Sequence, residues 1–380
     1  MGIAHSLYSH AIRPVVFRQP AEEAHESTKR MLKGSMPMGL LSSYSDLGKD
    51  KLSVDLGGKV KLDGPIGIAA GFDKDAEMLD GLSQLFDYIT IGTLLPYKWP
   101  GNPKTASGDP STSRIVRLEE EEAMLNCLGF PFSGLDNALA NVSRYGASIP
   151  INASIAVRPP QEGQSMEDVI EQFKSMAGMI ARHVPSRIAM VEVNFASPNT
   201  KGLAVFFEKG VFEELSTTTV GVLGGKGALT LMKMPPHLDS QTRARNIGVA
   251  KRWIEAGGEG LTVINTVKTS DPRLSMGAGG KSGRPIFDTM MGNLKDYRQA
   301  LGPEPIINAV GGITAERVPQ AIIDGGADTV QVYTPFIYHG PTYVRDAKAA
   351  LMRSLKSKGI GSLGELRQKA IRQADSLVKT

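Results

Sequence analysis

From about residue 60 onward, short runs of apolar residues alternate with longer stretches in which apolar residues recur every three to four positions. Eight runs are predicted as strands: 64–71, 88–92, 150–157, 189–194, 229–234, 261–265, 305–310 and 328–333. Helical periodicity lies between them, for instance over residues 165–184, 240–258 and 315–326, and the last two stretches end on glycines typical of helix C-terminal caps. Eight strand–helix repeats favour an α/β fold of the (β/α)8, or TIM barrel, type over an open doubly wound sheet.

The N-terminal segment carries a different pattern. Its apolar residues fall at helical spacing: Ile3, Leu7, Tyr8, Ala11, Ile12, Val15 and Val16. A second helical pattern follows over residues 21–32. Neither stretch approaches the ~18 apolar residues needed to cross a bilayer, and no cleavage site typical of a secretory signal is present. We therefore predict a small N-terminal helical extension, residues 1–45, that either packs against a barrel of residues 46–380 or rests on a membrane surface.

Composition narrows the class of protein further. The chain has 380 residues, enough for one large barrel and an appendage, and 41% of them are hydrophobic. Its 43 basic and 39 acidic residues are spread along the chain, so no tail or block indicates nucleic-acid binding. A single cysteine, Cys127, excludes intramolecular disulfides and cysteine-based zinc sites and indicates a reducing, cytoplasmic location. No metal site is predicted.

In a barrel of this type, the chemistry gathers where the strands end and the βα loops begin. Gly311 and Gly312 follow the seventh predicted strand, and Tyr333 and Thr334 follow the eighth. This is where barrels commonly hold a phosphate on backbone N–H groups, although a glycine pair can also form a simple tight turn. Residues 281–283 lie in what we predict to be a glycine-rich loop after the sixth strand, which would add further donors.

Two lysines, Lys74 and Lys233, are expected to project into the mouth of the barrel from different strands. A lysine facing a barrel interior is costly unless an anion pairs with it, although a solvated loop lysine is the alternative. Four asparagines are also expected at this rim: Asn126, Asn194, Asn199 and Asn265. Any one of them could cap a turn, but together their amides could bind a planar molecule with imide and carboxylate groups.

Ser197 is the candidate catalytic base. Pro198 restricts it to the extended region of backbone conformation and so fixes the direction of its side chain. In a closed site, a positioned hydroxyl with a route for losing its proton can remove a proton from a substrate C–H bond. The alternative is a serine that only bonds to the backbone of its own loop.

Several motifs occur in an order found in one enzyme family: "AAGFDK", "LGF", "NFASPNTKGL", "INT", "KSGRP", "NAVGGI" and "VQVYT". Over roughly residues 5–350 the chain resembles the dihydroorotate dehydrogenases, and "SPNT" preceded by asparagine is the most specific element. The resemblance implies an FMN-binding barrel that oxidises dihydroorotate to orotate in pyrimidine biosynthesis. Class 1 members carry a cysteine base where this chain has Ser197. The serine and the N-terminal helices therefore resemble class 2, whose extension associates with a membrane and passes electrons to a quinone.

Carried over position by position, the resemblance implies that Ser197 takes a proton from the substrate ring while a hydride passes to the flavin. The implied substrate ligands are Lys74, Asn126, Asn194, Asn199, Asn265 and Thr266. The implied cofactor contacts are Ala70, Gly71, Lys74, Thr93, Ser154, Asn194, Lys233, Ser282, Gly283, Gly311, Gly312, Tyr333 and Thr334. His25 and Arg117 match positions near the quinone tunnel. The implied location is the cytoplasm, peripheral on the inner face of a membrane.

The chain departs from the family pattern at three positions. Ser154 stands where the family has an asparagine, Ile264 where a threonine is expected, and Leu128 where an aromatic residue is expected. Three alternatives therefore stay open. The first is a divergent flavin-dependent paralogue acting on another small cyclic substrate, and the second is a flavin-binding relative that has lost dehydrogenation. The third is a non-redox barrel in which the glycine pair holds a substrate phosphate.

Overall fold

The computed structural model describes residues 6–33, 47–146 and 149–378. Eight parallel strands form a closed barrel. In spatial order they are β10 (Gly260–Val263), β13 (Ile306–Val310), β14 (Thr329–Val332), β3 (Ile66–Asp73), β4 (Tyr88–Leu94), β7 (Ile151–Ile155), β8 (Ile188–Val193) and β9 (Leu229–Met234), and β9 pairs back to β10. Every one overlaps a run predicted as a strand, so the prediction of a TIM barrel is confirmed.

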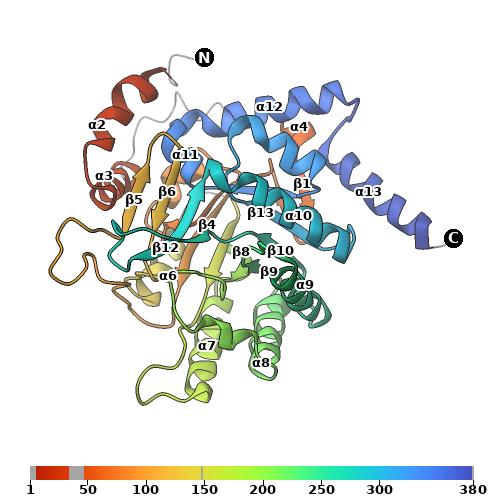
Figure 1. Cartoon of the computed structure of the whole chain (residues 1–380). Helices are drawn as coiled ribbons and strands as arrows, with labels where there is room; N and C mark the ends of the chain where they lie inside the picture. The colour runs from red at the N-terminus through yellow and green to blue at the C-terminus, as the bar shows by residue number, and fades with distance from the viewer. Residues whose placement is uncertain (1–5, 34–46, 147–148, 379–380) are drawn as a thin grey trace.

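Helices surround the barrel (Figure 1). They are α5 (Leu79–Ser83), α6 (Leu135–Arg144), α7 (Met166–Ala181), α8 (Val211–Thr218), α9 (Ser240–Glu255), α10 (Phe287–Leu301), α11 (Thr334–His339) and α12 (Tyr343–Ser357). Helices α7 and α9 confirm the predictions for 165–184 and 240–258. The helix predicted over 315–326 is present as one continuous helical segment over residues 315–324, which begins as a 3₁₀ turn at Ala315–Arg317 and ends as a π-helical turn at Gln320–Asp324. Pro319 lies between them and cannot donate a helical hydrogen bond.

The interior of the barrel is unusually polar, since barrels of this fold are mostly filled by branched apolar side chains. The Tyr88 hydroxyl donates to Asn308 Oδ1 at 2.9 Å. The amides of Gln331 and Asn152 both donate to Thr90 Oγ1, at 2.9 and 3.3 Å. All five side chains are buried, and these bonds reduce the cost of taking their polar groups out of water.

A four-stranded antiparallel sheet that the sequence did not predict lies beside the barrel mouth. Its strands, in order, are β11 (Val267–Ser270), β12 (Ala278–Gly283), β6 (Ala123–Asn126) and β5 (Ile115–Leu118). The prediction of a glycine-rich loop at residues 281–283 is therefore wrong. A Cβ on Gly279 would collide with the backbone of Asn126, and one on Gly280 with the Thr266 hydroxyl. The glycines thus let strands approach closely, and the sheet carries Asn126 and Ser282 to the mouth.

The N-terminal extension comprises a π-helical turn (Tyr8–Ile12), α2 (Arg13–Phe17) and α3 (Ala21–Lys33), close to α11 and β5 (Figure 1). One face packs on the barrel domain, where Tyr8 and Arg13 donate hydrogen bonds to backbone carbonyls of α11, at 2.5 and 3.1 Å. Other apolar side chains of the extension are exposed: Leu7, Ile12, Val15 and Met31. Ile3 and the boundary predicted at residue 45 lie outside the described residues. No helix in the described ranges is both long and apolar enough to cross a bilayer.

At the opposite end of the barrel, α4 (Lys49–Leu52) leads into a hairpin of β1 (Val54–Leu56) and β2 (Val60–Leu62). The C-terminal helix α13 (Leu363–Val378) contacts both α4 and β1. These elements lie near the first residues of β9 and β13, at the N-terminal ends of the strands. In this fold that end serves stability rather than chemistry.

Candidate functional site

A narrow cavity of about 170 Å³ lies between the C-terminal ends of the barrel strands and the four-stranded sheet. The structure brings most of the predicted site residues onto its wall: Ala70, Gly71, Lys74, Thr93, Asn126, Asn194, Ser197, Asn199, Lys233, Asn265, Thr266, Ser282, Gly311, Tyr333 and Thr334. Among the described residues, this wall contains two lysines and no carboxylate. Its charge therefore suits an anionic ligand, such as one bearing a carboxylate or a phosphate.

The amides of the four asparagines are arranged in two hydrogen-bonded pairs. Asn199 Nδ2 donates to Asn126 Oδ1 at 2.6 Å, and Asn265 Nδ2 donates to Asn194 Oδ1 at 3.2 Å. Asn194 Nδ2 in turn donates to Thr93 Oγ1 at 3.0 Å. Asn199 Oδ1 is buried and has no hydrogen-bond partner among the residues that the structure describes. The pairs fix the orientation of the amides and leave a buried acceptor for a ligand to satisfy.

Ser197 lies in the loop directly after β8, and its side chain reaches the same cavity as Lys74 and Asn265. Its Oγ also accepts a hydrogen bond from the backbone N–H of Asn199 at 3.3 Å. The hydroxyl therefore bonds to its own loop and also lies on the cavity wall, and its role as a base stays a prediction. The bond from the loop orients the hydroxyl.

The two lysines differ in their surroundings. Burial lowers the pKa of Lys74, while the carboxylates of Asp75 and Glu22 act in the opposite direction. Lys233 is only 6% exposed, and its Nζ lies 3.6 Å from Oε1 of Glu192. Sequence reasoning missed Glu192, which lies within an apolar run predicted as a strand. The sequence did hold one signal: Glu192 is two positions before Asn194, and residues two apart on a strand lie on the same face.

Three glycines lie on the side where a phosphate is predicted, with Gly311 on the cavity wall and Gly283 and Gly312 behind it. Gly283, Gly311 and Gly312 have positive φ values of 94°, 137° and 66°. A Cβ on Gly312 would lie 2.7 Å from the carbonyl oxygen of Gly283, so no larger residue fits there. On the cavity wall beside Gly311, the hydroxyls of Ser282 and Thr334 lie 2.8 Å apart. Backbone and hydroxyl groups without a neighbouring carboxylate suit a phosphate, so the predicted phosphate side of FMN fits these residues.

Three of the predicted cofactor residues lie behind the cavity wall rather than on it: Ser154, Gly283 and Gly312. Ser154 is fully buried, and its Oγ lies 3.2 Å from Thr93 Oγ1, which does reach the cavity. A contact from Ser154 to a ligand would therefore pass through Thr93. Of the apolar residues on the wall, Leu128 and Ile264 are the two departures named from the sequence, whereas Ile115 and Met124 were not predicted because they look like ordinary strand positions.

A second hollow of about 860 Å³ lies between α3 and the barrel and shares Lys74 and Tyr333 with the cavity wall. His25 lines this hollow, and its Nε2 lies 2.7 Å from the carbonyl oxygen of Phe72. Burial, followed by the charge of Lys74, lowers the pKa of His25 to about 4, so the imidazole is neutral near pH 7.

Arg117, the other residue predicted near a quinone, lines neither hollow. Its Nη1 donates to the carbonyl oxygens of Phe17 and Gln19, at 3.1 and 2.8 Å. Its guanidinium also lies over the Phe17 ring, 4.8 Å from the centroid. Arg117 therefore fastens the connection between α2 and α3 to strand β5.

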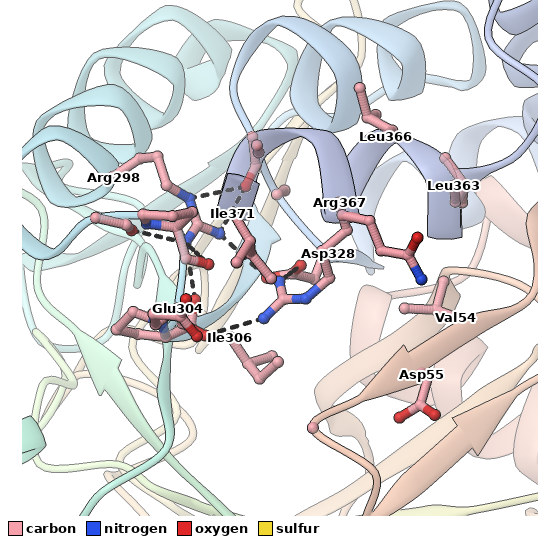
Figure 2. A pocket seen from close by; sticks show the side chains of 18 of the residues that line it. Val54, Asp55, Arg298, Glu304, Ile306, Asp328, Leu363, Leu366, Arg367 and Ile371 are labelled. Atoms are coloured by element: carbon pink, nitrogen blue, oxygen red, sulfur yellow. Dashed lines mark hydrogen bonds and ion pairs between the residues drawn. The ribbon is translucent and has the colours of Figure 1, made fainter. Parts of the chain in front are cut away.

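A third hollow, of about 800 Å³, lies at the N-terminal ends of the strands, under α13 (Figure 2). Two arginines and Asp328 in this hollow bind one another and the backbone. Asp328 accepts hydrogen bonds from Arg298 and Arg367, and Arg298 also donates to the carbonyl of Gly326. Because these charges are already paired, size alone does not make this hollow a binding site. The smaller cavity at the opposite end holds the polar groups that are free to bind a ligand.

Comparisons with known proteins identify the family of the chain. The family model of dihydroorotate dehydrogenase matches residues 52–355. Among curated relatives, the dihydroorotate dehydrogenase (quinone) of Paraburkholderia phymatum is 32% identical over 359 residues, covering 91% of this chain and 98% of the relative. The protein of that name from Burkholderia pseudomallei is 31% identical over 361 residues, covering 92% and 99%.

Solved structures give the same assignment. The ligand-free dihydroorotate dehydrogenase of Eimeria tenella matches with a TM-score of 0.74 at 26% identity, over 90% of this chain and 97% of that one. The same enzyme in complex with ferulenol matches with a TM-score of 0.73, over 94% of this chain and 97% of that one. The barrel, the rim of amides and the matched motifs agree: the chain belongs to the dihydroorotate dehydrogenase family, a family of oxidoreductases.

Proposed function

We propose that this protein oxidises dihydroorotate to orotate with bound FMN and passes the electrons to a quinone. The names of the curated relatives support the substrate and the acceptor. The observation that carries the proposal is the meeting of Ser197 with Lys74, Lys233 and Asn265 at one cavity rim. A hydroxyl, two cations and a ring of amides are what proton removal from a small anionic ring requires.

The substrate ring is held by side chains from four segments of the chain. Lys74 pairs with the substrate carboxylate, and the asparagine amides bind the imide edge of the ring. Asn199 Oδ1 and Thr266 Oγ1, which have no partner among the described residues, supply further groups for hydrogen bonding. Thr266 is placed by its backbone N–H, which donates to Asn265 Oδ1 at 2.8 Å.

Ser197 takes the ring proton as its own hydroxyl proton passes to water, and the Asn199 backbone N–H holds its oxygen in place. Bound FMN supplies the acceptor for the hydride. Lys233 and Thr93 hold its ring, and Ala70, Gly71 and Tyr333 line the same wall. Gly283, Gly311, Gly312, Ser282 and Thr334 hold its phosphate, and Ser154 acts through Thr93.

The N-terminal extension, residues 1–45, provides access for the quinone, and residues 46–380 form the FMN-binding barrel. Exposed Leu7, Ile12 and Val15 give the extension an apolar face with which to rest on a membrane. The hollow lined by His25 lies between α3 and the barrel and adjoins the cavity at Tyr333. This arrangement supports a peripheral location on the cytoplasmic side of a membrane.

The test is a turnover assay on purified protein supplied with FMN. We expect absorbance near about 450 nm from bound flavin and dihydroorotate-dependent reduction of a soluble quinone. Protein that never acquires this absorbance would instead support a non-redox phosphate-binding barrel. A flavoprotein that other donors reduce but dihydroorotate does not would be a paralogue with another substrate. A control is Lys356→Gln, which changes an exposed lysine on α12 that does not line the cavity.

A further inference from the structure

A carboxylate lies inside the barrel, directly behind the site. Glu192 on β8 is fully buried, and the strand register places it beside Ser154 on β7 and Leu231 on β9. Its Oε1 lies 3.6 Å from Lys233 Nζ. Within the described part of the chain, neither of its carboxylate oxygens has a hydrogen-bond partner.

A buried carboxylate without hydrogen bonds is strongly disfavoured unless a cation compensates it. Lys233 is that cation for Glu192. Lys233 lines the cavity and Glu192 does not, so the carboxylate lies behind the ammonium group as seen from the cavity. A separation of 3.6 Å is longer than a hydrogen bond. The pair is therefore held by charge, and the N–H donors of Lys233 remain available to a ligand.

We propose that Glu192 is a positioning residue that offsets the charge of Lys233 and so weakens the preference of the site for reduced over oxidised flavin. The inference rests on the proposed binding of FMN. Hydride transfer adds two electrons and one proton to a neutral ring, which leaves one net negative charge. A lone lysine stabilises that charge strongly, whereas a lysine paired with a carboxylate stabilises it less. The pairing keeps the flavin easier to reoxidise by the electron acceptor.

The test is the midpoint potential of bound FMN in the parent protein, Glu192→Gln and Glu192→Asp, measured against reference dyes. Glu192→Gln removes the charge at nearly constant volume. We expect it to shift the equilibrium toward reduced flavin by roughly tenfold or more, which corresponds to about 30 mV for a two-electron couple. Glu192→Asp keeps the charge and should stay close to the parent. The affinity for sulfite, which adds to the flavin and leaves the ring negative, should rise by a similar factor in Glu192→Gln.

Two further variants separate charge from packing. Glu192→Met is a second neutral variant and should raise the potential as Glu192→Gln does. Glu259→Gln neutralises a partly buried carboxylate near the opposite end of the barrel and should leave the potential unchanged. If Glu192 only supports the fold, the neutral variants would change the melting temperature but not the potential, which would overturn the inference. A parent protein that binds no flavin would contradict the proposed function instead.

Discussion

Acidification should release the N-terminal extension from the barrel, because His25 is buried in its neutral form. The pKa of His25 falls from an ordinary value of 6.5 to about 4 in the folded protein. At a pH between these two pKa values, His25 is mostly neutral in the docked extension and mostly protonated in the undocked one, where it lies in water. The docked state therefore loses stability relative to the undocked state as the pH falls. The contribution of neutral His25 to docking of the extension is complete well above pH 6.5. At pH 5 about 2 kcal/mol of it is lost, which corresponds to roughly thirtyfold in the docking equilibrium.

The assay is hydrogen exchange at the backbone amides of α3, compared at pH 7 and pH 5 after correction for intrinsic exchange. Helix α7 serves as the internal reference. His25→Gln provides the matched control, because glutamine keeps an N–H donor for the Phe72 carbonyl but does not titrate. Glu22 does not confound the comparison: burial alone would raise its pKa, but the hydrogen bonds from Arg114 and the charges of Arg114, Lys104 and Lys74 together outweigh burial and lower it. Equal loss of protection in the parent and in His25→Gln would refute the reasoning.

Two other substitutions test parts of the account. Lys348→Met leaves Asp87 buried without the ammonium group that now lies 2.5 Å away, so we expect a loss of about 3–5 kcal/mol in unfolding free energy. Urea unfolding of this variant and of the exposed-site control Lys356→Met would measure the loss. Equal unfolding free energies for the two variants would contradict the role of the Lys348–Asp87 ion pair. Gly283→Ala places a Cβ against the backbone at a φ of 94° and should weaken FMN binding about tenfold or more. Gly292→Ala on α10 is the control, because no atom lies within 4 Å of the Cβ that it adds. It should leave FMN affinity, measured by fluorescence titration, unchanged.

The barrel could be predicted because its buried parallel strands read as apolar runs at regular intervals. The residues around the barrel mouth could be predicted from the same strands, because Lys74, Lys233 and Asn265 lie at or near strand ends and meet at one cavity. The four-stranded sheet could not. Its strands are only four to six residues long, and β6 pairs with β12, more than a hundred positions later in the chain.

The contact of Glu192 with Lys233 also could not be predicted, although its spacing from Asn194 indicates that both residues share a strand face. A single charged residue within an apolar strand can face solvent, a salt bridge or a core, and only the strand register places it behind Lys233. Ser154 illustrates the same limit. Its position in the chain matches a cofactor ligand, but its hydroxyl lies behind Thr93 rather than on the cavity wall.

The most direct test of the central claim is the rate at which dihydroorotate bleaches the bound flavin in the absence of oxygen, in a single turnover. If Ser197 is the base, Ser197→Ala should bind FMN and orotate as the parent does but bleach ~10²–10⁴-fold more slowly. Dithionite should still reduce the flavin of both proteins fully. A Ser197→Ala protein that bleaches at the parent rate would contradict the account.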